Sequence, residues 1–307
     1  MSQSRTVRTI IKSKPTLEGA GVHLKRVFGN NEVSLFDPFL LLDDFRSDDP
    51  AHYIAGFPWH PHRGIETITY VLKGDVEHGD SMGNKGVISS GDTQWMTAGS
   101  GIFHQEMPQG DPEGRMEGFQ LWANLPRSHK MMDPRYRDVK RSQVPEVRTE
   151  SGATIKVICG RVGKHQGPVR DIVIDPEYFD VTVPAGAEFV HPTKRGHTVF
   201  AYVIEGKGRF DTSSDAFIGN GTLALFADGD TVAVTAKNEP VEPLQHPDMS
   251  GLDNATSRSS GVRFLLISGK PIGEPVAWSG PIVMNTEEEL EEAFEEHRNG
   301  TFIKDKQ

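Results

Sequence analysis

The sequence predicts an all-β protein made of two similar β-barrel domains, for three reasons. Its 307 residues are enough for two domains of ordinary size. Glycine and proline recur along the whole chain, between short segments rich in β-branched and aromatic residues, which is typical of many short strands joined by tight turns. The third reason is an internal repeat of sequence, which indicates a duplicated domain.

The repeat consists of two pairs of short matches in the same order. Residues 70–74 read Tyr-Val-Leu-Lys-Gly and residues 202–206 read Tyr-Val-Ile-Glu-Gly, an offset of 132 positions. Gly-Asp-Thr at 91–93, followed by Thr-Ala at 97–98, recurs at 229–231 and 235–236, an offset of 138. Because the two offsets nearly agree, we interpret the matches as one duplication with a period far longer than that of a solenoid repeat.

The local patterns predict strands in both copies and one helix. The segment 65–72 is rich in β-branched and aromatic residues, and we expect strands also at 181–183, 198–204, 222–226, 231–235 and 262–267. Residues 110–150, with four prolines after apolar or acidic residues, are expected to contain the connection between the copies. Near the C-terminus, Thr286 and Glu289 form a capping box, and Leu290, Ala293 and Phe294 form an apolar stripe before Gly300, which predicts a helix over 286–299.

Composition excludes several classes of protein. A formal net charge of -10 and the absence of a Lys/Arg block argue against direct nucleic-acid binding. The single cysteine, Cys159, rules out an intrachain disulfide framework and fits a reducing compartment. Without a signal-peptide pattern or a long apolar run, we expect no membrane association, and a cytoplasmic protein that in a eukaryote could also be nuclear.

Two short motifs predict a metal site. His60-Pro61-His62 and His104-Gln105-Glu106 each place two donor side chains at positions i and i+2, which lie on the same face of a strand. Imidazole and carboxylate donors suit Fe, Mn, Co, Ni, Cu or Zn. In an octahedral site, four protein ligands leave two open positions. A lone His-x-His pair is more often a hydrogen-bonded or surface pair, so the second motif matters to the argument.

Glu66 competes with Glu106 for the carboxylate role. If the strand is regular from residue 60 to 72, the even positions share one face, and the apolar residues Ile68, Tyr70 and Leu72 mark that face as inward. Glu66 would then be a fourth ligand, an acceptor behind a ligand histidine, or a buried acid. Spacing and composition do not choose between the two glutamates.

Several other side chains near the motifs are candidates for lining a pocket beside the metal. For each of them taken singly, a place in the ordinary core is the more common role. The candidates are Phe57, Trp59, Gln94, Trp95, Met96 and Phe103, together with Ile102.

The repeat also predicts that the second copy binds no metal. An offset of 132 places Pro192, Lys194 and Thr198 where the first copy has His60, His62 and Glu66, and an offset of 138 places Glu242 and Leu244 where it has His104 and Glu106. His191 and His197 lie nearby, but their six-residue separation breaks the His-x-His spacing. We therefore expect one metal ion per chain.

Long stretches around these motifs resemble the pirin family. The resemblance rests on Asp37-Pro38-Phe39-Leu40-Leu41, on 57–67 around the two histidines, on 91–108 around His104, on Gln120-Leu121-Trp122 and on 280–286. It covers nearly the whole chain. Thr97 stands where cupins usually have proline, His104 comes later than expected, and Ile282 replaces a frequent phenylalanine.

The resemblance implies a fold and a ligand set. Pirins are bicupins, with two double-stranded β-helix (jelly-roll) barrels and metal only in the N-terminal one. The implied domains are a metal-binding cupin over 1–140 and a metal-free cupin over 141–307 that includes the helix at 286–299. Carried over residue by residue, the family's ligands are His60, His62, His104 and Glu106, and Glu66 moves behind the ligands.

Two functions are implied by the resemblance. The first is a quercetin 2,3-dioxygenase, in which dioxygen opens a planar phenolic flavonol and Glu106 takes the proton of a ring hydroxyl. The second is an iron-dependent, redox-sensing regulator that binds a transcription factor as a protein partner. We expect the enzyme, with Fe(II) as the metal, and a monomer, because two fused barrels already form the pair that single cupins often reach by dimerising.

Overall fold

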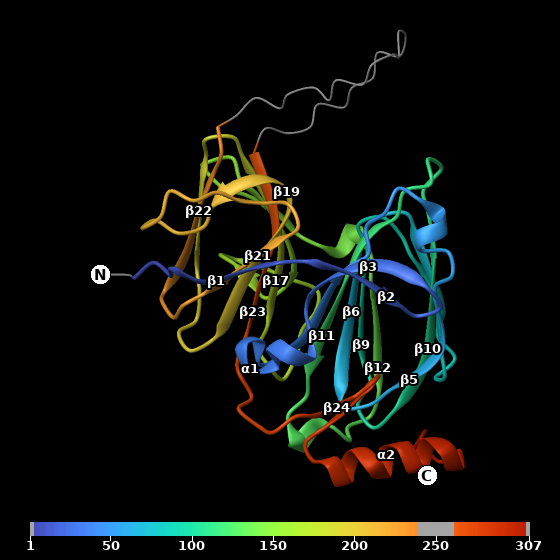
Figure 1. The fold of residues 1–307 in the computed structure, drawn as a ribbon. Helices are drawn as coiled ribbons and strands as arrows, with labels where there is room; N and C mark the ends of the chain where they lie inside the picture. The colour runs from blue at the N-terminus through green and yellow to red at the C-terminus, as the bar shows by residue number, and fades with distance from the viewer. Residues whose placement is uncertain (1–2, 239–260, 305–307) are drawn as a thin grey trace. The chain divides into compact units, whose positions relative to one another are not determined.

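The computed structural model describes residues 3–238 and 261–304, which form two compact units. We call them the N-terminal barrel (Ser13–Pro145, Ile158–Pro176 and Gly269–Gln307) and the C-terminal barrel (Met1–Lys12, Glu146–Val157 and Glu177–Ser268). These units differ from the predicted division at residue 140. Residues 7–12 form a strand of the C-terminal barrel, whereas the C-terminal segment, with its helix, belongs to the N-terminal barrel (Figure 1).

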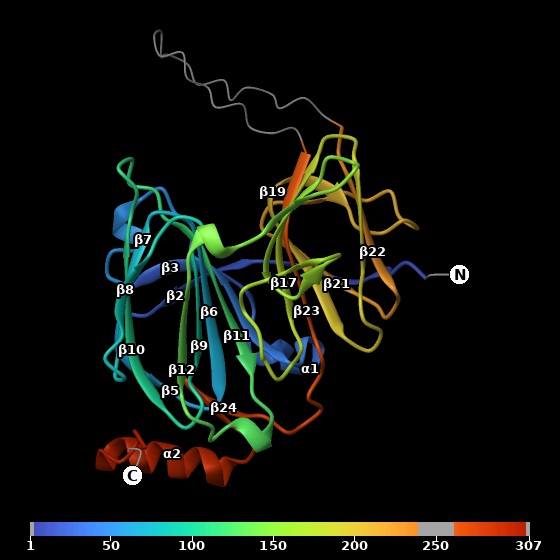
Figure 2. The ribbon, with the colours of Figure 1, turned by 180° about the vertical axis from the view of Figure 1, so that it is seen from behind.

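The N-terminal barrel consists mainly of a seven-stranded sheet, β12-β9-β6-β11-β4-β3-β2, and a four-stranded sheet, β5-β10-β7-β8 (Figure 2). Its long strands are β2 (Lys14–Glu18), β3 (Val22–Phe28), β4 (Phe39–Asp44), β5 (Phe57–His62), β6 (Ile65–Lys73), β7 (Asp75–Asp80), β8 (Lys85–Ile88), β9 (Thr93–Thr97), β10 (Ile102–Gln109), β11 (Glu117–Asn124) and β12 (Arg135–Val139). Shorter elements are α1 (Val33–Phe36), β15 (Arg161–Val162), β16 (His165–Gln166), β24 (Ala277–Ser279), β25 (Ile282–Met284) and the 3-10 turns η1 (Asn30–Glu32), η2 (Pro50–His52), η3 (Arg127–His129) and η4 (Arg141–Gln143).

The C-terminal barrel repeats this architecture around a sheet in the order β1-β21-β19-β23-β17-β14-β13. Its strands are β1 (Val7–Lys12), β13 (Glu146–Arg148), β14 (Thr154–Cys159), β17 (Glu177–Pro184), β18 (Glu188–Pro192), β19 (Thr198–Arg209), β20 (Ile218–Gly219), β21 (Thr222–Phe226), β22 (Thr231–Ala236) and β23 (Gly261–Gly269). The predicted strands in this copy are therefore all present. The segment predicted to hold the connection contains the unit boundary at Pro145, but it also contains β11 and β12 of the first sheet.

The two sheets show which parts of the repeat correspond. The order β9-β6-β11-β4 in the first barrel matches β21-β19-β23-β17 in the second, so the match between β6 and β19 aligns equivalent central strands. The other match aligns β9 with β22, which are not equivalent, because β21 holds the place of β9 beside the central strand. The short Gly-Asp-Thr motif recurs in a different turn, so its offset of 138 is wrong for placing the second copy's site.

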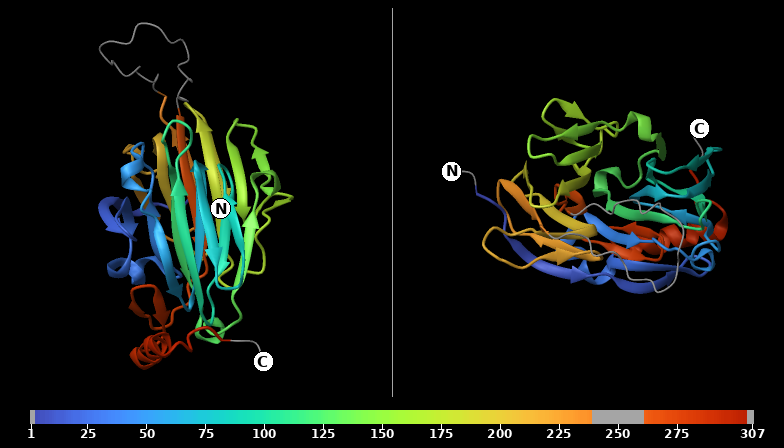
Figure 3. Two further views of the ribbon diagram at one scale, coloured as in Figure 1. Left: turned by 90° about the vertical axis from the view of Figure 1, so that its right-hand side faces the viewer. Right: turned by 90° about the horizontal axis from the view of Figure 1, so that it is seen from above.

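The predicted C-terminal helix is α2 (Glu287–Asn299), drawn in red in Figure 3. Thr286 is its N-cap, its hydroxyl accepts from the Glu289 amide, and Gly300 ends the helix at φ 74°. Leu290 and Ala293 pack with Ala277, Ile282, Met284 and Phe302 in one apolar cluster, with Phe294 at its edge. The helix therefore closes one end of the N-terminal barrel. In the described residues, no helix is long and apolar enough to cross a membrane.

Candidate metal centre

Three histidine side chains converge inside the N-terminal barrel. His60 and His62 come from β5, His104 comes from the neighbouring strand β10, and His104 lies directly opposite His60 in the antiparallel register. The Nε2 atoms of His60 and His62 are 3.1 Å apart, and those of His60 and His104 are 2.9 Å apart. All three donor atoms lie within 4.8 Å of one another. The two predicted motifs are thus brought together by strand pairing.

The hydrogen bonds of the imidazoles fix which ring nitrogen faces the centre. The Nδ1 atom of His60 lies 2.8 Å from the Pro58 carbonyl oxygen, and that of His62 lies 3.0 Å from the Pro281 carbonyl oxygen. A carbonyl only accepts, so each Nδ1 carries the proton and donates it. The lone pairs of Nε2 then point at one another, which is repulsive without a cation. This donor set fits a divalent transition metal.

Burial supports the neutral form of the inner two rings. His62 and His104 are 1% and 0% exposed. Burial lowers the pKa of both imidazoles well below the usual value, and the neighbouring histidines lower it further. A neutral imidazole is the form that binds a metal.

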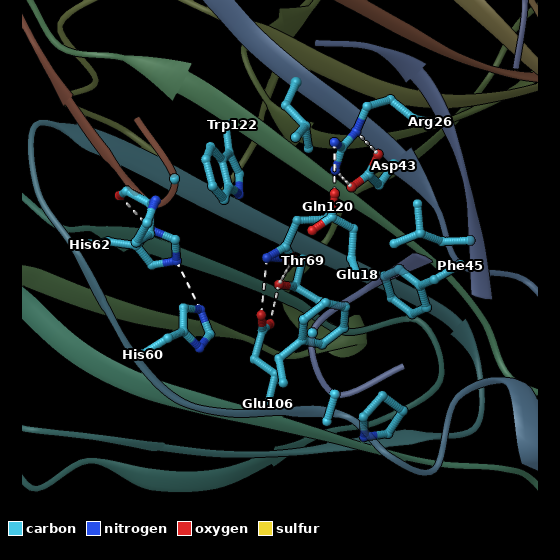
Figure 4. Close-up of a pocket in the computed structure, with 18 of the residues that line it drawn as sticks. Glu18, Arg26, Asp43, Phe45, His60, His62, Thr69, Glu106, Gln120 and Trp122 are labelled. Carbon is cyan, nitrogen blue, oxygen red and sulfur yellow. Dashed lines mark hydrogen bonds and ion pairs between the residues drawn. The ribbon is translucent and has the colours of Figure 1, made fainter. Parts of the chain in front are cut away.

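Glu106 lies on β10, two residues after His104, and its carboxylate is held by two neighbours (Figure 4). The Thr69 hydroxyl donates to its Oε1 at 2.6 Å, and the Gln120 amide donates to its Oε2 at 3.0 Å. The Thr69 oxygen also lies 2.8 Å from the Gln120 Oε1, but its single proton goes to the carboxylate, because a charged acceptor forms the stronger bond. Glu106 is outside the group of converging nitrogens, so its ligation of the metal stays a prediction.

Glu66 lies on the other face of its strand, away from the histidines. The condition of one regular strand from residue 60 to 72 is not met: β5 ends at His62, Gly64 adopts φ 78°, and β6 begins at Ile65. The break reverses the parity, so Thr69 faces inward and Glu66 faces outward. Glu66 accepts a hydrogen bond from Thr97 at 2.6 Å and lies 3.8 Å from Arg135, while burial raises its pKa.

A cavity of about 610 Å³ opens beside His60, His62 and Glu106, between the two sheets of this barrel. Trp122 contributes an aromatic wall, with its ring centroid 5.0 Å from that of His62. Of the predicted pocket residues, Phe57 lines this cavity. The cavity lining also includes Glu18, Arg26, Asp43, Phe45, Thr69, Gln120, Trp278 and Pro281.

The other predicted wall residues lie elsewhere, because strand parity and packing direct them away from the cavity. Trp59 is 53% exposed, on the outer face of β5. Trp95 is buried on the face of β9 opposite Ile68, and Gln94 is buried opposite Thr69 without reaching the cavity surface. Met96 packs with Ile65, Ile102 and Val283, and Phe103 packs against the helix cluster.

The C-terminal segment that begins at Gly269 completes the site. The sequence did not predict this contribution. Trp278 and Pro281 line the cavity, and the Pro281 carbonyl accepts from His62. This segment is anchored by Lys130, whose Nζ donates to the Val283 carbonyl at 2.9 Å, and by Arg63, which donates to the Phe302 carbonyl at 2.8 Å. Both anchors are buried.

Thr69, Gln120, His78 and Asp80 are further inward residues that sequence reasoning missed. His78 and Asp80 lie on β7 opposite Glu106 and His104, with 3.5 Å between Nε2 and Oδ2. The His-x-Asp spacing was a readable signal, since i and i+2 share a face. No spacing pattern in the sequence pointed to Thr69 or Gln120, because their contact depends on the register of β6 against β11.

The described residues of the C-terminal barrel hold no such histidine cluster. In β18 and β22, Pro192 pairs with Thr231 where the first barrel pairs His60 with His104. His191 is buried 3.3 Å from the Glu177 carboxylate, which gives it an ordinary partner. Glu242 and Leu244 lie outside the described residues. Within the described part of the chain, His60, His62 and His104 are the one group of three that can hold a metal.

Two related barrels with a histidine triad in the first define the class of two-domain cupins. The family pattern described as Pirin matches residues 21–123, and that described as Pirin C-terminal cupin domain matches residues 178–303. The chain belongs to the pirin family.

Several known proteins are similar over their whole length. A pirin-like protein of Caulobacter vibrioides is 42% identical, over 97% of this chain and 99% of its own. Pirin of Rattus norvegicus is 36% identical, over 97% and 94%. A crystal structure named quercetin 2,3-dioxygenase, from Acinetobacter baumannii, superimposes with a TM-score of 0.83 at 28% identity, over 98% of this chain and 99% of its own.

Proposed function

We propose that this chain is a metal-dependent dioxygenase that opens the heterocyclic ring of flavonols such as quercetin. The observation that carries the proposal is the Glu106 carboxylate. It lies on the wall of the cavity beside the histidines, with both oxygens held by Thr69 and Gln120. The structural likeness to a protein named quercetin 2,3-dioxygenase supports the same reaction class.

We propose His60, His62, His104 and Glu106 as the ligands of one divalent ion, Fe(II) in the first place. Mn, Co, Ni, Cu and Zn accept the same donors. When bound, the metal supplies an open coordination position and lowers the pKa of a hydroxyl that occupies it. The three histidines contribute no charge in their neutral form, so the carboxylate is the one anionic ligand.

Glu106 acts as the general base in this proposal. It takes the proton of the substrate's ring hydroxyl, which leaves an electron-rich enolate for dioxygen. The hydrogen bonds from Thr69 and Gln120 orient the carboxylate toward the cavity. Trp122 and Phe57 bracket a flat substrate and exclude water from it. Ring opening consumes dioxygen and releases carbon monoxide.

The experiment compares wild type with Glu106→Gln, a change that keeps the side-chain length and removes the base. Each protein is loaded with each metal in turn, and the loss of quercetin absorbance is followed in air. We expect turnover by wild type and a fall of about 10²–10⁴-fold in kcat in the variant. Unchanged absorbance with every metal, or equal rates for the two proteins, contradicts the proposal.

A further inference from the structure

A row of polar side chains crosses the inner face of the large sheet, from the metal side of the cavity to its far end. In the register, Thr69 on β6 lies opposite Gln120 on β11, Gln120 lies opposite Asp43 on β4, and Asp43 lies opposite Arg26 on β3. Directly opposite residues share a face, and all four line the cavity. Three steps between neighbouring strands span about 14 Å. The row is long enough for a planar molecule of several rings.

The far end of this row carries a cluster of three charges. The Arg26 Nε and Nη2 donate to the two oxygens of Asp43 at 2.9 and 2.8 Å, and its Nη1 lies 2.8 Å from the Glu18 Oε1. Figure 4 shows Arg26 and Asp43 at the end of the pocket away from His60 and His62, with Gln120 and Thr69 between. With one cation and two carboxylates, the far-end cluster of Glu18, Arg26 and Asp43 has a formal charge of -1.

Three of the five N–H donors of Arg26 are directed at the two carboxylates, and the carboxylates keep spare acceptor capacity. Each carboxylate oxygen has two lone pairs, so Asp43 and Glu18 can accept more hydrogen bonds than Arg26 provides. An anionic substituent would meet a cluster with a net negative charge. A neutral hydroxyl would meet acceptors. The far end of the cavity is therefore built to receive hydrogen-bond donors.

We propose that the far-end cluster determines substrate specificity, by accepting hydrogen bonds from hydroxyl groups on the ring of the substrate remote from the histidines. For a flavonol, that ring is the phenyl substituent. The inference rests on the proposed function for the orientation of the substrate. It names the preferred class as polyhydroxylated, uncharged aromatic compounds and excludes those with an anionic group on the remote ring.

The alternative role for this cluster is structural, because the Arg26–Asp43 pair also ties β3 to β4. A matched control separates the two roles. Asp44 is the next residue on β4, is equally buried, and is paired with an arginine: its oxygens accept from the Nε and Nη2 of Arg46 at 2.8 and 2.6 Å. Its side chain lies on the other face of the strand, outside the cavity lining.

The test measures binding of quercetin and of galangin, which lacks the phenyl hydroxyls, to the full-length metal-loaded protein without dioxygen. We expect wild type to bind quercetin about tenfold more tightly, as for a hydrogen bond to a charged group. Asp43→Asn and Glu18→Gln should each reduce this ratio toward one, and Asp44→Asn should keep it. The ratio of two affinities does not change when part of the protein is unfolded.

A second probe is quercetin sulfonated on the phenyl ring, for which Asp43→Asn should have the opposite effect on affinity. Wild type should exclude it, and Asp43→Asn should bind it several-fold more tightly, because the cluster becomes neutral. A structural role would not improve the binding of any ligand. The inference is overturned if the quercetin-to-galangin affinity ratio is the same in Asp43→Asn as in Asp44→Asn, or if wild type shows no preference for quercetin.

Turnover in air is assayed separately. If hydroxyl preference persists without turnover, the proposed reaction is wrong and the binding specificity stands. If turnover occurs with no hydroxyl preference, the proposed reaction stands and the proposed specificity is wrong.

Discussion

The Nδ1 atom of His62 lies 3.0 Å from the carbonyl oxygen of Pro281, 219 positions away in the sequence. This hydrogen bond fixes the tautomer of a histidine in the triad from a segment that follows the whole C-terminal barrel. The anchors of that segment therefore affect the geometry of the metal site. Groups that orient ligands in this way commonly change metal affinity by ten- to a hundredfold.

Replacing Arg63 should weaken metal binding without removing a ligand. Arg63 is 2% exposed and donates to the Ser100 and Phe302 carbonyls, so Arg63→Met frees the end of the C-terminal segment. We expect the dissociation constant for the metal to rise about tenfold or more, measured by competition with a chelator. Arg298→Ala, an exposed change on α2, is the control. Equal affinities in the two variants would mean that the anchor does not reach the site.

Metal content should depend on the triad and not on the buried histidine of the other barrel. His104→Gln removes one of three converging nitrogens, and we expect bound metal to fall well below one per chain. His191→Gln, which also changes a buried strand histidine, should keep the wild-type content. Elemental analysis of both proteins after gel filtration measures this. If His191→Gln loses the metal and His104→Gln keeps it, the metal site lies in the C-terminal barrel and the assignment is wrong.

Thr69→Val should reduce turnover when the protein is saturated with metal. The substitution keeps the shape of the side chain and removes the 2.6 Å hydrogen bond to Glu106. A bond to a charged group contributes about 1.5–3 kcal/mol, so kcat should fall by about tenfold or more. The control is Thr67→Val, on the same face of β6, because the Thr67 hydroxyl has no hydrogen-bond partner among the described residues. Identical losses in both variants would show that only packing is affected.

Trp122 should contribute to substrate binding, whereas Trp59 should not. Trp122 lines the cavity beside His62, and Trp59 is 53% exposed outside it. Trp122→Leu should raise KM for quercetin about tenfold, because an aromatic face is lost. Trp59→Leu should leave KM within about twofold. Steady-state kinetics with both variants checks the expectation. An equal rise in KM for both would mean that Trp122 has no specific role in substrate binding.

Asp43 gives the stability of the protein a distinct pH dependence. Burial raises its pKa to about 6 although Arg26 opposes the shift, and Glu18 and Asp44 raise it slightly. Because the folded state then holds this proton more tightly than the unfolded state, Asp43 stabilises the fold below about pH 4. That contribution is lost as the pH rises through about 6. The free energy of unfolding, relative to Asp43→Asn, should fall by about 3 kcal/mol over this range.

Denaturant unfolding of wild type and Asp43→Asn from pH 4 to 7 measures the difference. Asp44→Asn, compared in the same way, shows whether the effect belongs to the carboxylate inside the cavity. A difference that stays constant over the range would contradict the raised pKa.

Local sequence determined much of this protein. The spacing of His60, His62 and His104 on strands, the central strands 65–72 and 198–204 of two related barrels, and the capped helix ending at Gly300 depend on nearest-neighbour geometry. Such features are readable because side chains alternate along a strand and caps act within one turn. The family resemblance added that the two barrels are cupins, which the comparisons confirm.

Tertiary structure decided what depended on contacts between distant strands. The left-handed turn at Gly64 reversed the parity, so that Glu66 faced outward and Thr69 inward. The register of β6, β11, β4 and β3 placed Gln120, Asp43 and Arg26 along one cavity, and the C-terminal segment supplied Pro281. Side chains alternate along a strand, so the sequence determines which residues of one strand share a face. Which strands pair, and in which register, is decided only in the folded protein.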